Sequence, residues 1–345
     1  MNLYIIGNGF DLAHGFKTSY YNFKEYLLAH GDKVYNYNGF SISNKDIVNK
    51  FEEVCKPRDS WMDFEVQVGK IIYKIQEDKI NLFGKEWNLK LDLGEGQYRF
   101  VDAVKEQMDI HLGEIDTLFT QKEIKDKAMD YFNDKVTKNY LWIPSLYTSF
   151  QDWIKTVDIS KGSPYFKIDK DSSAISFNYT KTLQEIYSIT DILFIHGSTN
   201  ALDDIVLGYH SISIDEDLPG LHTTYTEEHR KSQEASSQAG IKKPSSNKFY
   251  NDNINRFYKP VNVLKDKIKP FIQEKSIDTV TIIGHSYSEI DWPYFEEVVK
   301  MLPKAHYVFT YYNSEDNINV KEMLRRLELD LDYEEVYSEN LKIKE

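Results

Sequence analysis

Short runs of apolar residues, each bounded by glycine or polar residues, recur along the chain. They cover Leu3–Ile6, Ala174–Phe177, Ile192–Ile195, Ile205–Leu207, Thr279–Ile283 and His306–Thr310. Continuous apolar runs of this length are typical of strands buried on both faces, as in a parallel sheet covered by helices. Segments with helical spacing, such as Thr180–Tyr187 and Trp292–Met301, lie between these runs. The pattern predicts an α/β fold with a doubly wound parallel sheet.

The interval between the first two runs is too long for a single crossover, and helical spacing dominates it. Trp61–Ile75, Phe100–Phe119 and Tyr140–Ile154 have the periodicity of amphipathic helices. We therefore expect residues 34–170 to form a large helical insertion, while residues 1–33 and 171–345 form the α/β domain. Residues 214–255 are polar, which predicts a mobile loop within that domain.

Composition narrows the class of protein. The formal net charge of −13 disfavours nucleic acid as a partner, because the chain has no overall positive field. Cys55 is the only cysteine, which favours a reducing compartment. We find neither a signal peptide nor a run of about eighteen apolar residues that would span a membrane. A soluble, cytoplasmic protein is expected.

Glycines follow the first predicted strand directly, in the turn Gly7-Asn8-Gly9-Phe10-Asp11. A backbone without Cβ atoms admits a phosphate to its amides, and Asp11 adds an acceptor for a ribose hydroxyl. A tight turn that only packs a helix against the sheet would use the same residues.

Polar residues also follow three later strands. Asn178 ends one strand, and it either caps the next helix or holds a water or a carboxamide. His196 and Gly197 end another, where an imidazole is suited to accept a proton unless it is simply hydrogen-bonded in place. The third segment is "GHSYSEID", with Gly284, His285, Ser286, Glu289 and Asp291, and a capped turn into a helix is its alternative interpretation.

Because parallel strands present their carboxyl ends at one edge, these four segments converge on one crevice. Their order resembles that of the sirtuin-like NAD-binding fold, a Rossmann variant. The resemblance implies NAD as the ligand and Asn178 and His196 as the catalytic residues. It also implies a cofactor-binding set of Gly7, Asn8, Gly9, Phe10, Asp11, Gly15, Gly197, Gly284, His285, Ser286, Glu289 and Asp291.

A closer resemblance is to the bacteriophage abortive infection AbiH family. The chain carries "GNGFDLAHG" near its start, "FNYT" and "LQEIY" in the middle, then a histidine-glycine pair, and finally "GHSYSEIDWPYF". These motifs are spread over most of the chain. Membership implies defence against phage by damaging or arresting the infected cell.

Departures from the sirtuin pattern change the expected reaction. Sirtuin deacylases have an aspartate two residues after the asparagine, where this chain has Thr180, and they carry a four-cysteine zinc module that one cysteine cannot make. We therefore expect NAD to be a substrate whose nicotinamide-ribose bond is cleaved by water. No metal is expected.

Two alternatives stay open. A nucleotide-binding sensor that recruits a partner without turnover would use the same crevice. A nuclease or nucleic-acid binder would need a carboxylate cluster for metal or a basic stripe. Neither is evident in the sequence, although Asp11, Glu289 and Asp291 are candidates for such a cluster. A phage-derived trigger and assembly into a homo-oligomer are also expected, because a toxic effector must be held inactive until infection.

Overall fold

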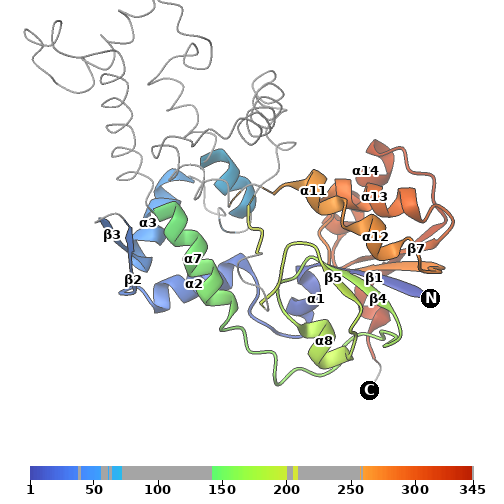
Figure 1. Cartoon of the computed structure of the whole chain (residues 1–345), viewed down its shortest axis with the longest axis horizontal. Coiled ribbons are helices and arrows are strands. Elements are labelled where there is room, and N and C mark those ends of the chain that lie inside the picture. Colours follow the sequence, from blue (N-terminus) through green and yellow to red (C-terminus); the bar gives the residue numbers. More distant parts are fainter. Residues whose placement is uncertain are drawn as a thin grey trace, which may run out of the picture.

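The computed structural model describes residues 1–37, 40–55, 61, 64–71, 142–199, 205–208, 257 and 259–343 (Figure 1). The helix predicted at Phe100–Phe119 and the loop predicted at 214–255 lie outside the described residues. The described part of the chain forms a parallel sheet with helices on both faces and, beside it, a separate group of helices with a hairpin.

Six strands form the sheet, and all neighbouring strands are parallel. They are β1 (Asn2–Ile6), β4 (Ser173–Ser176), β5 (Ile192–Phe194), β6 (Thr279–Ile283), β7 (His306–Tyr311) and β8 (Tyr333–Tyr337). Their order is β5-β4-β1-β6-β7-β8. After β1, the next two strands in the chain, β4 and β5, are added on one side of it, and β6, β7 and β8 are added on the other side. Renumbered along the chain, this is the order 3-2-1-4-5-6 of dinucleotide-binding sheets. The order reverses between β1 and β6, so their carboxyl ends are adjacent at a switch point.

Five of the six strands predicted from apolar runs are present, within two residues at each end. The strand predicted at Ile205–Leu207 is wrong, because those residues pair with no strand in the described part of the chain. Ile205 and Leu207 instead pack into the cluster of the separate helical group, which accounts for their apolar character. Strand β8 was not predicted, because its sequence is polar and three of its five residues are exposed.

Alternate residues of β1 point to opposite faces of the sheet, as expected for a strand. Leu3 and Ile5 join a cluster with α11 (Val261–Lys265), α12 (Ile268–Ile272), α13 (Trp292–Met301) and α14 (Ser314–Arg326). Tyr4 and Ile6 join another with α1 (Asn8–Ala13) and α8 (Thr182–Tyr187). Burial on both faces explains why β1 has no polar alternation.

The separate helical group contains α2 (Tyr20–Ala29), α3 (Asn44–Val54), a helix over residues 64–71, α7 (Trp142–Ile154) and the hairpin of β2 (Val34–Tyr37) and β3 (Phe40–Ser43). The prediction at Tyr140–Ile154 is confirmed by α7, whereas the hairpin was not predicted. Helices α2 and α3 both begin with capping boxes. Because α2 packs with α3 and α7, the helical group draws residues from before Val34. The division of the chain at residues 34–170 stays a prediction.

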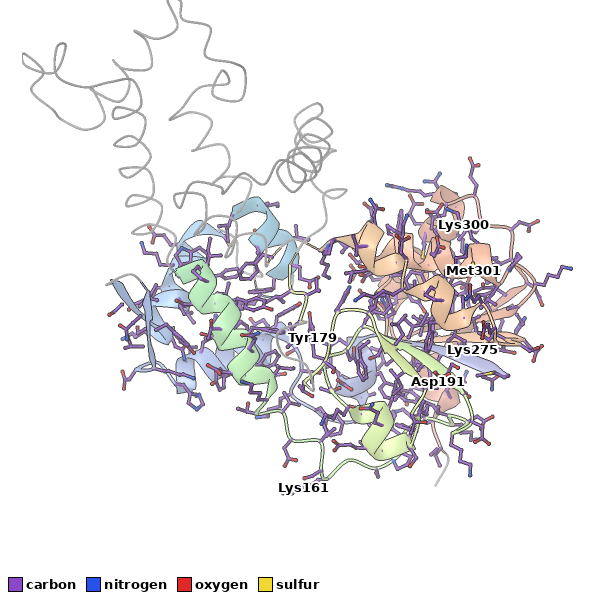
Figure 2. All side chains as sticks on the ribbon, viewed as in Figure 1. Lys161, Tyr179, Asp191, Lys275, Lys300 and Met301 are labelled. Carbon is purple, nitrogen blue, oxygen red and sulfur yellow. The ribbon has the colours of Figure 1, made fainter. Side chains whose placement is uncertain are left out.

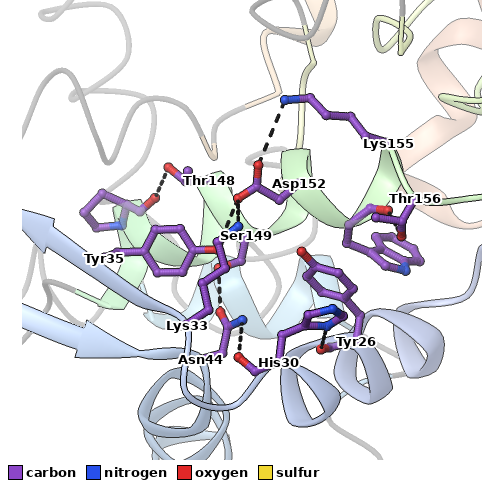
Figure 3. Close-up of polar contacts among 12 residues, drawn as sticks. Tyr26, His30, Lys33, Tyr35, Asn44, Thr148, Ser149, Asp152, Lys155 and Thr156 are labelled. Carbon is purple, nitrogen blue, oxygen red and sulfur yellow. Dashed lines mark hydrogen bonds and ion pairs between the residues drawn. The ribbon is translucent and has the colours of Figure 1, made fainter.

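Polar contacts hold the hairpin and α3 against α7 (Figure 3). Asp152 accepts from Lys33 Nζ at 2.7 Å and from the Tyr35 hydroxyl at 3.2 Å. Ser149 donates to Asn44 Oδ1 at 3.0 Å, and Asn44 Nδ2 donates to the carbonyl of His30. These bonds fix one side of the helical group without taking part in the crevice at the sheet.

The helical group meets the sheet near Tyr179, which Figure 2 shows between the two. Its ring packs edge-on against Phe150 of α7, with centroids 5.3 Å apart, and its hydroxyl donates to the carbonyl of Val206 at 2.9 Å. Because Tyr179 lies in the segment after β4, the carboxyl edge of the sheet and the helical group are in contact at this point.

Candidate functional site

A cavity of about 910 Å³ opens at the carboxyl ends of the central strands. It lies at the switch point between β1 and β6, where open α/β sheets bind their ligands. Its volume is in the upper part of the range of roughly 300–1,000 Å³ that small-molecule sites occupy. The helical group contributes the opposite side through Tyr20, Trp61, Glu65, Phe150 and Trp153.

Most of the predicted site residues line this one cavity. They are Gly7, Asn8, Gly9, Asp11, Asn178, His196, Gly284, His285, Ser286 and Asp291. The convergence expected from the strand ends is therefore present in the structure, although the roles assigned to these residues stay predictions.

Four predicted residues do not line it. Phe10 is fully buried beneath the turn and stacks on Phe166. Gly15 follows α1 with a φ of +79°. Gly197 has a φ of +84° in the turn after His196, and Glu289 forms an ion pair with Arg326 at 3.0 Å.

The glycines of the first turn serve backbone packing against the turn after β6. Gly9 N–H donates to the carbonyl of Gly284 at 2.8 Å, and Gly7 N–H donates to Ile283 at 2.9 Å. A Cβ atom at Gly7 would lie 2.5 Å from the oxygen of Gly284, and one at Gly9 would lie 2.9 Å from its Cα. The close approach that the sequence indicated is therefore made by another stretch of main chain. The amides of Gly7 and Gly9 already have acceptors.

Asp11 ties α1 to the segment after β4. Its Oδ2 accepts from the Thr180 hydroxyl at 2.6 Å, and its Oδ1 accepts from the Thr182 hydroxyl at 2.7 Å. Asp11 is 1% exposed, and this burial raises its pKa against the opposing effect of the hydroxyls. Thr180 therefore has a buried partner within the protein.

Asn178 points its amide at the first turn and does not cap α8, which begins after Lys181 without a side-chain cap. Its Nδ2 donates to the carbonyl of Gly7 at 3.1 Å, which fixes the amide plane. The residue is 6% exposed, and its Oδ1 has no hydrogen-bond partner. A buried acceptor without a partner is costly, so this atom is suited to a ligand group or a bound water.

His196 is a buried imidazole held by aromatic rings. Its ring meets Phe177 edge-on at 5.2 Å between centroids, and its Nε2 lies 3.4 Å from the Tyr294 hydroxyl. Burial, together with the charge of Lys259, lowers the pKa of His196 well below its ordinary value. The imidazole is therefore neutral at neutral pH.

His285 and Asp291 form a second arrangement in the cavity. Tyr287 N–H donates to His285 Nδ1 at 3.1 Å, so the proton of the neutral ring is on Nε2, which lies 3.6 Å from Asp291 Oδ2. Tyr287 has a φ of +55°, an uncommon conformation for a non-glycine residue, and it places the amide on His285. Burial lowers the pKa of His285 to about 3 and raises that of Asp291.

An ion pair between Lys259 and Glu65 lies in the same cavity and was not predicted. The two side chains are 3% and 19% exposed and 2.7 Å apart, and Glu65 also accepts from the Tyr20 hydroxyl at 3.0 Å. A lysine and a glutamate usually lie at the protein surface, so the residue types give no signal for this pair.

Polar atoms without partners concentrate at the cavity. Among the described residues, five buried side-chain atoms have no partner: Thr18 Oγ1, Ser172 Oγ, Asn178 Oδ1, Asp291 Oδ1 and Thr310 Oγ1. All of these residues except Ser172 line the cavity. Because native structures leave few such atoms unpaired, their clustering indicates a ligand site.

The carboxylates proposed for a nuclease do not converge as a group, because Glu289 is paired with Arg326 outside the cavity. Within the described part of the chain, no three histidine, cysteine or carboxylate side chains are grouped so as to hold a metal ion. Within the same part, no helix is both long and apolar enough to cross a membrane.

A family model described as bacteriophage abortive infection AbiH covers residues 3–312. That range contains all four strand-end segments and the Lys259–Glu65 pair. Neither a curated protein nor a solved structure matches the chain.

Proposed function

The chain belongs to the bacteriophage abortive infection AbiH family, and we propose that it is a cytoplasmic effector that hydrolyses NAD at the nicotinamide-ribose bond. Family membership points to a role in abortive infection. The strand order and the helices on both faces of the sheet support a doubly wound sheet of the sirtuin-like kind.

The observation that carries the proposal is the partnerless Oδ1 of Asn178 in the same cavity as the neutral ring of His196. One group can orient a water or a ribose hydroxyl, and the other can accept a proton. Phe177, which follows β4 and precedes Asn178, contacts the His196 ring and lines the cavity between them.

The proposed reaction needs little more than these groups. The C1′–N bond breaks and its electron pair leaves with nicotinamide, which becomes neutral, while a positive charge develops on the ribose. The oxygen of a water held by Asn178 bonds to C1′, and the proton that this water loses passes to His196. His196 then returns the proton to solvent.

The depressed pKa of His196 sets an expectation for pH. A base is lost as the pH falls through its pKa, and here that value lies well below 6.5. Cleavage of NAD should therefore be retained when the pH is lowered from neutral to the histidine's ordinary pKa.

Purified protein incubated with NAD, with nicotinamide measured by chromatography, tests the proposal. We expect His196→Ala and Asn178→Ala each to reduce the rate by about a hundredfold, the usual range for acid–base groups. His306→Ala is the matched control, because His306 begins β7 and does not line the cavity.

Parent-rate cleavage by His196→Ala would show that the mechanism is wrong. A second outcome is that the parent protein never releases nicotinamide, even when it is purified from phage-infected cells. In that case the protein is a nucleotide-binding sensor. A phage-derived trigger and a homo-oligomeric active form belong to the proposal in either case, and sizing chromatography with and without nucleotide tests the second.

A further inference from the structure

Asp291 differs from the other carboxyl groups of the cavity. Among the described residues that line it, five carry carboxyl groups, namely Asp11, Glu65, Asp291, Asp316 and Glu339, against the two lysines Lys259 and Lys342. Four of these five carboxyl groups form hydrogen bonds or ion pairs with other residues of the protein. Asp11 accepts from two threonines, Glu65 pairs with Lys259, Asp316 accepts from Tyr312 N–H, and Glu339 pairs with Lys342.

Asp291 alone among these five has a buried oxygen without a partner, Oδ1. Its other oxygen faces the N–H of His285, whose ring is fixed in turn by the amide of Tyr287. The amide of Tyr287 thus fixes the His285 ring, and the ring faces the Asp291 carboxylate. Because this ring is neutral, it supplies no positive charge to compensate the charge of the carboxylate.

The lysine that could neutralise Asp291 is held elsewhere. Lys259 donates to Glu65 at 2.7 Å, although it is close enough to Asp291 for its charge to act on that carboxyl group. Glu65 thereby keeps the lysine from completing an ion pair with Asp291. A carboxylate taken out of water without a counter-ion is unfavourable, and burial accordingly raises the pKa of Asp291. A cation from outside the protein would supply the missing charge and favour the ionised form.

The surroundings favour a flat organic cation. Tyr20, Phe177 and Tyr179 line the cavity as half-buried rings, and Phe177 packs edge-on against His285 at 4.9 Å between centroids. Burial, and to a smaller degree the charges of Glu65 and Asp291, raises the pKa of Tyr20 and of Tyr179, so their hydroxyls stay neutral. Aromatic rings around a carboxylate attract cations through their π-faces and stack on planar ones.

From these contacts we infer that Asp291 Oδ1, with the rings of Phe177 and Tyr179, forms a subsite for a positively charged planar ring of the pyridinium class. The choice of a pyridinium rests on the proposed function, whereas the preference for a cation follows from the cavity alone.

Two probes isolate the charge. Nicotinamide and 1-methylnicotinamide share a ring and a carboxamide, but only the second is a cation. Trp61 and Trp153 line the cavity, so quenching of tryptophan fluorescence can report binding, with calorimetry as a second method. We expect the parent protein to bind the cation about tenfold more tightly, a difference of about 1.4 kcal/mol.

Variants then locate the preference. Asp291→Asn keeps the shape of the side chain and removes its charge, and it should bind the two probes alike, whereas Asp291→Glu should keep part of the preference. Asp316→Asn is the matched control, because it removes a carboxylate from the same cavity whose Oδ2 already accepts from Tyr312 N–H, and its preference should equal that of the parent.

Equal affinity of the parent for both probes, or no measurable binding of the cation, would overturn the subsite without any variant having to fold. A preference that persists in Asp291→Asn would overturn the role of this residue. Cleavage of NAD is measured separately, so failure of the hydrolase proposal is distinguishable: the parent would then prefer the cation and release no nicotinamide.

Discussion

The cavity has two polar sides that use their hydrogen bonds differently. Tyr20, Glu65 and Lys259 bond to one another across one side. At the strand ends opposite, Asn178 and Thr310 each retain a buried atom without a partner. Polar groups that satisfy one another stabilise the fold, whereas groups left unsatisfied are costly unless a ligand completes them. The comparison separates residues that build the cavity from residues suited to bind in it.

The largest expected effect comes from the backbone that joins β1 to β6. Gly284 has a φ of +70°, and a Cβ atom there would lie 2.1 Å from the amide nitrogen of Phe10. We expect Gly284→Ala to lower the free energy of unfolding by about 3–5 kcal/mol, measured by urea denaturation, because strain and overlap act together.

Gly15→Ala is the control for this substitution. Gly15 has a φ of +79° but nothing within 4 Å of the added Cβ atom, so the loss should be only about 1 kcal/mol. If Gly284→Ala and Gly15→Ala lowered the free energy of unfolding equally, the close contact between the turns after β1 and β6 would not stabilise the site. For the same reason we expect a larger side chain at Gly9 to destabilise the fold, because its Cβ atom would lie 2.9 Å from Gly284 Cα.

The next largest effect is expected at the Lys259–Glu65 ion pair. Lys259→Met leaves Glu65, whose side chain is 19% exposed, without its counter-ion, and we expect a loss of about 2 kcal/mol in the free energy of unfolding. Lys259→Met combined with Glu65→Leu should recover most of this loss, because apolar pairs of similar volume replace buried ion pairs at little cost. A double variant no more stable than Lys259→Met would show that the pair has no such coupling.

This division also explains what could be predicted from the sequence. Strands β1, β4, β5 and β6 are predicted from their apolar runs, and the topology of a parallel sheet brings their polar ends together without any knowledge of side-chain contacts. Lys259 and Glu65 are ordinary polar residues in sequence, and only tertiary packing buries Lys259 and brings the two together. Ile205–Leu207 was mistaken for a strand because burial in a helical cluster requires the same apolar residues.

Acid should weaken the contribution of His285 to stability. Its pKa is about 3 in the folded protein and ordinary when unfolded, so the unfolded chain binds a proton first as the pH falls. The stabilisation is present above the ordinary histidine pKa and is lost below it, by about 2 kcal/mol between pH 7 and pH 5. The raised pKa values of Asp11 and Asp291 act in the opposite direction.

Comparison with His285→Asn isolates this term, because an asparagine oxygen can still accept from Tyr287 N–H. The difference in unfolding free energy between parent and variant should shrink by about 2 kcal/mol between pH 7 and pH 5. A difference that does not change with pH would mean that His285 is not held neutral.

The smallest change in stability is expected where a hydroxyl has no partner. Thr310 is 1% exposed, its Oγ1 is unpaired, and its carbonyl accepts from the Tyr287 hydroxyl at 2.7 Å, a main-chain bond that substitution leaves intact. Thr310→Val should therefore alter the unfolding free energy by no more than about 0.5 kcal/mol, since it removes a polar atom that has no bond to lose.

The same substitution at Thr180 is the matched comparison, because that hydroxyl donates to the buried carboxylate of Asp11 at 2.6 Å. Thr180→Val should cost about 2 kcal/mol, the usual range for a hydrogen bond to a charged group. Thr310→Val should instead weaken binding of NAD, measured by calorimetry, because the hydroxyl then lost is one that only a ligand completes. If Thr310→Val destabilised the protein as much as Thr180→Val and bound NAD like the parent, partnerless atoms would not mark the ligand side of this cavity.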